Sequence, residues 1–177
     1  GAWEEYEAMS PEERESEGLH SLPEIRLDDG TDDTEREIRK ANVKLKSFID
    51  YLIMLLLSSL DPDLISMVMD LEGLKEGLMA VEHGLDVTKF KAKKAKIVEK
   101  LYDKAQELAK EIDANPREAA EANAKMQRIY HTIQQLNEID KTLDGLVQQA
   151  MAAVQETRGT ADNVRNITQQ GKLSRSR

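Results

Sequence analysis

The stretch from Asn115 to Ile167 carries apolar residues at heptad spacing, and it constrains the fold more than any other feature of the chain. Its three rows are Ile129, Leu136, Leu143, Ala150 and Val164; Ile139, Leu146, Ala153 and Ile167; and Met126, Ile133, Val147, Val154 and Ala161. A helix of this length cannot bury such a stripe alone, so it needs partner helices of similar length. Because three rows can face two neighbours, the pattern favours a bundle or a multi-chain coil over a two-stranded zipper.

The composition also favours helices. Aromatic residues make up 4% of the chain and charged residues 33%, while nine glycines and four prolines leave long stretches uninterrupted. The sequence lacks the Gly-rich turns and β-branched runs of a compact α/β enzyme. We therefore predict an all-α fold: an elongated antiparallel helical hairpin or coiled-coil bundle of about four helices, with a largely disordered acidic N-terminal segment.

Helix start and stop signals divide residues 34–170 into one helical domain. The predicted helices cover residues 34–60, 62–83, 87–114 and 116–157, with a short helix at 160–170. Thr34 with Glu37, and Asn115 with Glu118, have the spacing of capping boxes. Gly73 and Gly77 favour a close approach between helices, and Gly84 is expected to cap a helix end. Residues 171–177 are expected to form a frayed basic tail.

Residues 1–33 are rich in acids and poor in aliphatic residues, which indicates disorder. Ser10-Pro11 with Glu13 predicts one short helix, at 11–17. Trp3, Tyr6 and Met9 form a candidate docking segment, which either lies on a groove of the main body or of a partner, or belongs to an unstructured tail.

The end of the first long helix is apolar on all sides. The candidate residues are Tyr51, Leu52, Ile53, Leu55 and Leu56. The run is too short to span a bilayer, which requires about 18 apolar residues or more. It is therefore either a core segment or a surface for assembly or membrane contact.

Charge is unevenly distributed along the chain. The net charge is −9; residues 1–37 hold fourteen acids and three arginines, whereas residues 158–177 hold five bases and one acid. This balance argues against nucleic-acid binding, and it suggests either two solvated ends or electrostatic steering between copies. Lys89, Lys91, Lys93, Lys94 and Lys96 surround their helix, so we interpret them as a solvated surface that balances the acidic N-terminal segment. With no cysteine and no basic, apolar leader, we expect a cytoplasmic protein or one exported without a cleavable signal peptide.

No constellation of residues indicates catalysis. His20, His83 and His131 fit no zinc motif, and no phosphate-binding loop or nucleophile elbow is present. His131 is expected at the surface or boundary. Asp140, which interrupts the third row, either is buried with a Lys or Arg partner or, as we favour, lies at the solvent edge of its helix. We therefore expect no enzyme, no cofactor and no metal.

The leading interpretation is a structural, scaffolding or adaptor protein that assembles through its helices with a protein partner, a second copy included. The interaction candidates are Leu64, Leu71, Leu78, Ile129, Leu136, Leu143 and Leu146, and for each the alternative is the protein's own core. If the protein is an adaptor, its basic tail from Arg158 to Arg177 could be the part that binds an acidic surface of the partner. A membrane-peripheral or membrane-active protein is a further alternative, which the net charge of −9 does not favour.

In organisation the chain also resembles bacterial type III secretion substrates. It combines an N-terminal region predicted to be disordered, an apolar helix from Phe48 to Leu60, a long helical hairpin and an amphipathic C-terminal helix, and it has no cysteine. The resemblance implies an exported filament, tip or translocation subunit.

Overall fold

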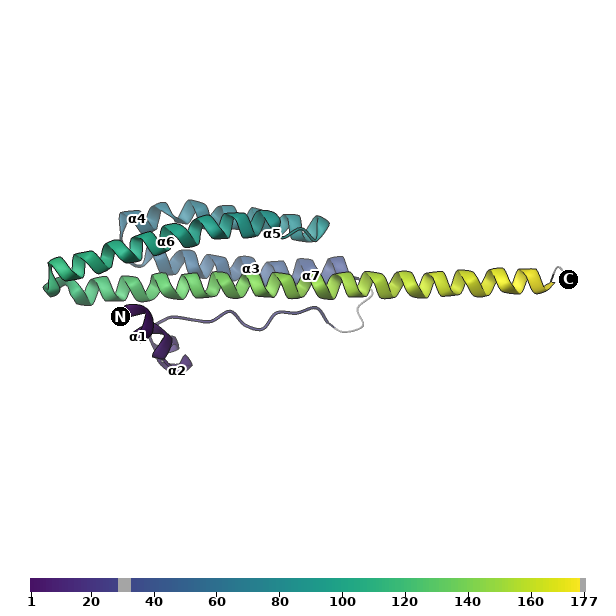
Figure 1. Ribbon diagram of the computed structural model, residues 1–177, viewed down its shortest axis with the longest axis horizontal. Coiled ribbons are helices and arrows are strands. Elements are labelled where there is room, and N and C mark those ends of the chain that lie inside the picture. Colours follow the sequence, from purple (N-terminus) through teal and green to yellow (C-terminus); the bar gives the residue numbers. More distant parts are fainter. Residues whose placement is uncertain (29–32, 176–177) are drawn as a thin grey trace.

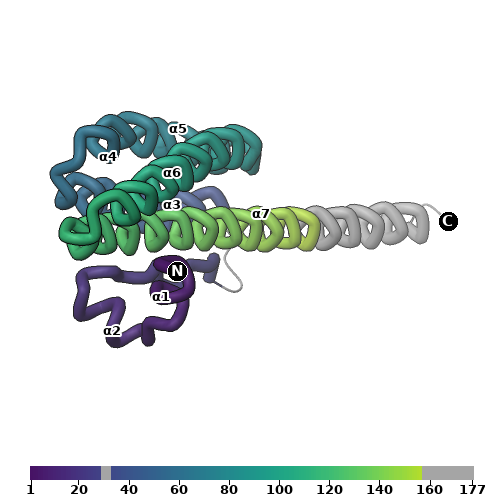
Figure 2. Tube along the Cα trace, turned by 60° about the vertical axis from the view of Figure 1, so that its left-hand side comes forward, coloured from purple at the N-terminus to yellow at the C-terminus, as the bar shows by residue number. Residues whose placement is uncertain are grey.

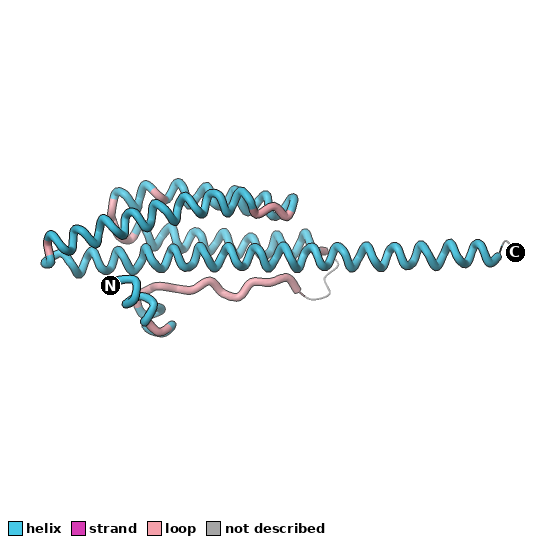
Figure 3. The backbone as a smooth tube through the Cα atoms, in the orientation of Figure 1, coloured by secondary structure: helices cyan, strands magenta, loops and turns pink. Residues whose placement is uncertain are grey.

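The computed structural model describes the backbone of residues 1–28 and 33–175 and the side chains as far as Glu156. The described residues are helical or irregular and contain no strand, so the all-α class is confirmed. In Figures 1 and 3 the helices α3, α5, α6 and α7 lie along one common direction. The molecule is elongated because α7 continues past the ends of the others.

The helices α3, α5, α6 and α7 form the body of the protein. Their bounds are Thr34–Leu57 for α3, Val68–Gly84 for α5, Thr88–Ala114 for α6 and Ala119–Arg175 for α7. Each runs opposite to the next (Figures 1 and 2), and contacts join α3 to α5, α5 to α6, α6 to α7 and α7 back to α3. The apolar stripes of these helices therefore close on one shared core.

Polar caps and serine hydroxyls set the helix ends. The side chain of Asp33, rather than Thr34, caps α3 by accepting from the Arg36 N–H at 3.0 Å. Asp61 caps the short helix α4, Pro62–Ser66. The Ser66 hydroxyl donates to the Asp63 carbonyl at 2.6 Å and the chain turns tighter at Met67, so the single helix expected at 62–83 is divided into α4 and α5.

The tight approach expected at the glycines occurs between α5 and α6. A Cβ placed on Gly77 would lie 2.9 Å from the Phe90 Cα atom, whereas one on Gly73 would meet nothing closer than Lys93 Nζ at 3.6 Å. Gly84 is the last residue of α5, but the left-handed cap is Leu85, at φ 54°. The absence of a side chain at Gly77 thus allows the backbones of α5 and α6 to pack closely.

The C-terminal part differs from the expectation. A short 3-10 turn, η1 (Pro116–Glu118), links α6 to α7. The break expected at Arg158–Thr160 does not occur, since α7 is continuous to Arg175. Residues 171–175 belong to this helix, and the rest of the predicted frayed tail lies outside the described residues. The helix continues through Gly159 because a single glycine lowers helix stability by only about 1 kcal/mol, and the neighbouring helix-forming residues offset this loss.

The N-terminal segment is ordered, contrary to the predicted disorder. It contains α1 (Ala2–Ala8) and α2 (Pro11–Ser16), the latter close to the predicted helix at 11–17, followed by an extended stretch. We call residues 1–28 the strap. The strap lies on the side of α7 opposite to α5 and α6 (Figures 1 and 2). Its few apolar side chains are buried against the body, and their burial offsets the unfavourable composition.

Candidate interaction surfaces

The residues expected to mediate assembly lie in the core of the single chain. Each has at most 1% of its surface exposed: Leu64, Leu71, Leu78, Ile129, Leu136, Leu143 and Leu146. They offer no surface to another molecule, so their assignment as intermolecular contacts is corrected. Heptad spacing identifies which residues are buried but does not identify the helix that buries them.

The apolar run near the end of α3 is also a core segment. Leu52, Ile53, Leu55 and Leu56 are buried, and Tyr51 is partly buried beneath the strap. Met54 and Leu57 point outward at the same end of α3. Among the described residues, no helix has the length and apolar character needed to cross a bilayer.

The candidate docking segment lies on the body of its own chain. Tyr6 is fully buried and packs with Leu19 and Leu55, with Trp3 and Met9 at the edge of this cluster. The Trp3 ring stands edge-on to the Tyr130 ring of α7, with centroids 4.9 Å apart. Of the two interpretations of this segment, the docking peptide agrees with the structure and the unstructured tail does not.

His131 is fully buried under the strap, which corrects its expected place at the surface. Its Nδ1 atom lies 2.7 Å from the Tyr6 hydroxyl, and its Nε2 atom lies 2.7 Å from the His20 carbonyl oxygen. Because a carbonyl can only accept, Nε2 carries a proton. Burial lowers the pKa of the imidazole from 6.5 to about 4, so His131 is neutral at pH 7 and its Nδ1 atom accepts from Tyr6.

Side chains of the body bind the main chain of the strap. The Leu22 N–H donates to Gln135 Oε1 at 2.8 Å, and the Leu27 N–H donates to Gln149 Oε1 at 3.1 Å. From α3, the Tyr51 hydroxyl accepts from the His20 N–H at 2.8 Å and donates to the Gly18 carbonyl. The extended stretch thus finds partners for these main-chain groups in the groove between α3 and α7.

The apolar stripe of α7 loses its cover beyond Ala150. Ala150 is fully buried, whereas Met151 is 50% exposed and Val154 is 39% exposed. Val147, one heptad before Val154, is still partly buried against the core. In Figure 1, α7 continues past the other helices from about this point, so the body covers only the first part of the stripe.

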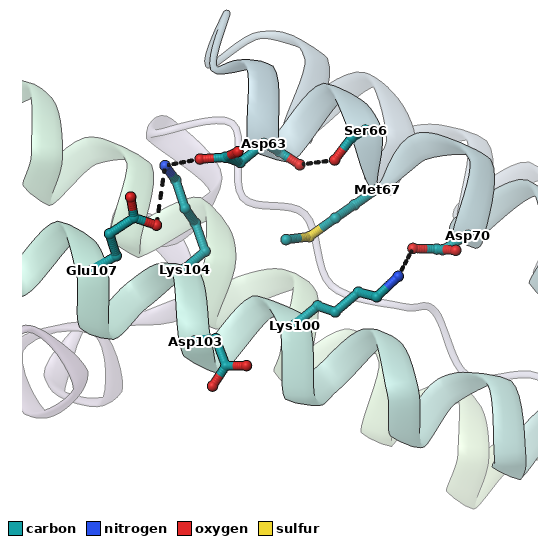
Figure 4. A pocket seen from close by; sticks show the side chains of 8 residues that line it. All are labelled: Asp63, Ser66, Met67, Asp70, Lys100, Asp103, Lys104 and Glu107. Carbon is teal, nitrogen blue, oxygen red and sulfur yellow. Dashed lines mark hydrogen bonds and ion pairs between the residues drawn. The ribbon is translucent and has the colours of Figure 1, made fainter.

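A charged groove of about 470 Å³ lies between α4, α5 and α6 (Figure 4). It is lined by Asp63, Ser66, Met67, Asp70, Lys100, Asp103, Lys104 and Glu107. The lysines bind acids across it, since Lys104 Nζ lies 2.7 Å from Asp63 and Lys100 Nζ lies 2.8 Å from Asp70. In the described part of the chain, no cluster of His, Cys, Asp or Glu has the arrangement of a metal site.

Asp61 stands at the centre of a buried ion cluster beside this groove. Its Oδ2 atom lies 3.2 Å from Lys104 Nζ and 3.1 Å from Lys125 Nζ. Burial alone would raise the pKa of Asp61, but the hydrogen bonds from Lys125 and Lys104 outweigh it and lower that pKa. The cluster connects the α3–α4 corner to α6 and α7, so its role is structural.

The lysines of α6 bind acids of the neighbouring helices rather than acids of the strap. Lys91 pairs with Asp140 and Asp144 of α7, and Lys94 Nζ lies 2.7 Å from Asp140. Lys93 pairs with Glu76 of α5. Asp140 is therefore a partly buried ion-pair residue, which agrees with the paired alternative and corrects the favoured place at the solvent edge.

The sequence interpretation missed the residues that hold the strap. Gln135 and Gln149 lie on one face of α7, two heptads apart, next to the buried rows. Polar residues at such positions are usually solvated, and only the nearby strap gives them main-chain partners. A search for amide side chains bordering an apolar row would have selected them among other candidates.

Comparison of the chain with protein-family models, with curated proteins and with solved structures found no match.

Proposed function

We propose that this protein is a non-enzymatic scaffold or adaptor that associates with other molecules through the part of α7 beyond the body. The observation that supports the proposal is the loss of cover along one apolar stripe. Ala150 is buried, whereas Val154 of the third row is 39% exposed and Met151, which lies beside the rows, is 50% exposed. In the sequence the same rows continue at Ala161, Val164 and Ile167.

A projecting helix of this kind gains from a partner. An isolated helix is only marginally stable in water, and most helical stability comes from packing an apolar face. The α3–α7 body fixes the start and direction of the helix, and a partner helix would bury its remaining stripe. The mode of association is therefore helix against helix, in the manner of a coiled coil.

A second copy of the chain is the partner that charge favours. Residues 158–177 carry five bases and one acid, whereas residues 1–37 carry fourteen acids and three arginines. An arrangement that brings the basic end of one copy beside the acidic end of another is electrostatically favourable at low salt. Glu12 and Glu17 of the strap are exposed, and no lysine whose side chain the structure describes, up to Glu156, forms an ion pair with them.

Light scattering over a concentration series tests this proposal. We expect the mass to rise above 20.0 kDa with concentration, and the rise to be smaller at high salt. Met151→Glu should suppress the rise, because it places a charge directly beside the stripe, one helical turn from Val154. Met79→Glu is the matched control, since Met79 is 51% exposed on α5. A mass of 20.0 kDa at every concentration would exclude the second copy as partner.

A further inference from the structure

The groove between α3 and α7 has the chemistry of a site for an extended peptide. Gln135, Gln149 and Tyr51 accept from main-chain N–H groups of the strap, at residues 22, 27 and 20 respectively. These contacts advance together along both segments, so the extended stretch runs parallel to α7 (Figure 3). Such contacts fix the path of a peptide main chain in the groove.

Near its end, over residues 24–28, the side chains of the strap alternate between the groove and solvent. Leu19, Ile25 and Leu27 are buried, whereas Glu24 and Arg26 are exposed. Ile25 and Leu27 join the main core, and Leu19 joins Tyr6 and Leu55. The groove therefore selects an extended segment with apolar residues at these spacings.

The strap binds the body as a separate segment would. Its hydrogen bonds to α3 and α7 are made by residues 6–27, and the chain connects it to α3 through residues 28–33. The same residues of another molecule offer identical groups to the groove. Exchange of identical elements between copies requires no new contact, which makes it a low-cost route to association.

We propose that the groove between α3 and α7 is a peptide-binding site, filled by residues 1–28 of its own chain and able to accept residues 1–28 of a second copy. The site is separate from the projecting end of α7. It uses Tyr51, His131, Gln135 and Gln149, whereas association through α7 uses Met151 and Val154.

His131 makes this binding sensitive to pH. A protonated imidazole has no acceptor for the Tyr6 hydroxyl and places a second charge near Arg14 of α2. The other groups around it are the Tyr6 phenol of α1, the His20 ring paired with Glu15, the Tyr51 phenol of α3 and the Tyr130 phenol of α7. None of the charged groups that face His131 favours the imidazolium, so acid weakens binding of the strap.

The test uses the full-length chain with its own strap disabled. Leu19→Glu with Ile25→Glu places charges where the strap is buried and leaves the groove unchanged. A fluorescent synthetic peptide of residues 1–28 is added, and its anisotropy is measured at pH 7.5 and pH 5. Tyr6→Ala in the full-length chain serves as a second acceptor, since it removes the contact to His131. Circular dichroism confirms that each acceptor is folded.

We expect saturable binding to both acceptors, at least tenfold tighter than to the wild-type chain, whose groove is filled. Affinity should fall at least tenfold from pH 7.5 to pH 5. A peptide carrying Leu19→Glu and Ile25→Glu should not bind. Folded acceptors that bind neither peptide, or both equally, overturn the proposal. Met151→Glu, added to either acceptor, should leave its affinity for the peptide unchanged. Peptide binding is then independent of association through α7.

Discussion

His131 occupies an environment that favours the neutral imidazole. It is fully buried, accepts from Tyr6 and donates to the His20 carbonyl. Burial is the main reason why its pKa falls from 6.5 to about 4. The folded state therefore binds this proton less readily than the unfolded chain, and acid must destabilise it.

The free energy of unfolding should depend on pH through His131. The contribution is complete above pH 6.5 and declines as the pH falls toward 4, by up to about 3 kcal/mol. Denaturant unfolding of the wild-type chain and of His131→Gln, measured at several pH values, checks this. The difference between the two should shrink over that interval. His83→Gln, at an exposed histidine of α5, is the control and should leave the pH dependence unchanged.

The sequence was sufficient to predict which residues are buried in the core, but not the partners of the buried polar residues. The positions of Leu64 and Ile129 in the core followed from spacing alone, because apolar rows must be buried somewhere. His131 and Asp140 were misplaced because polar residues are normally solvated. Their partners, Tyr6 and Lys91, are distant in the sequence, and only folding brings them close.

At the scale of elements, the distance between α5 and α6 depends on Gly77. A side chain there would meet the Phe90 backbone, which belongs to a packed helix and cannot move independently. Gly73 lies one turn earlier on the same helix and faces the flexible end of Lys93. The two glycines therefore have different roles despite their similar sequence context.

Gly77→Ala should destabilise the protein by about 1–3 kcal/mol, because the added methyl group forces α5 and α6 apart. Gly73→Ala should instead stabilise it by up to about 1 kcal/mol, through higher helix propensity. Thermal and denaturant unfolding of both variants measures these changes. Equal effects at the two positions would show that the close approach at Gly77 is unimportant.

Helix bounds followed the sequence where a cap or a proline marks them. The starts at Pro11, Thr34 and Pro62 lie where the capping signals predicted. The division at Met67 and the continuity of α7 past Gly159 were not predicted. These depend on small energy differences, since one glycine or one serine hydroxyl changes helix stability by about 1 kcal/mol or less.

On the scale of the whole molecule, the body protects only the first part of α7. The first two rows are buried from Ile129 to Ala150, and beyond Ala150 the exposed apolar side chains are Val154 of the third row and Met151 beside it. One helix therefore contains a segment fixed by α3, α6 and the strap, and a segment that its own chain leaves uncovered. Local stability should change along the helix at this point.

Hydrogen exchange should show this change. In dilute solution, amides of residues 126–150 should exchange slower than those of residues 151–156 by on the order of a hundredfold. Raising the concentration should slow exchange at residues 151–156 if copies associate there. Mass spectrometry of peptic peptides measures both effects. Uniform protection along α7 in dilute solution would contradict the boundary at Ala150.

By itself, the sequence determined the all-α class, the main helices and most of the core, because periodicity and capping are local properties of the chain. Tertiary structure decided that the rows of Leu71 and Leu136 close on one another within a single chain, and that the strap is ordered. It also decided the neutral state of His131 and the exposure of Met151. These features depend on which surfaces meet, and contacts between residues far apart in the sequence leave no local pattern.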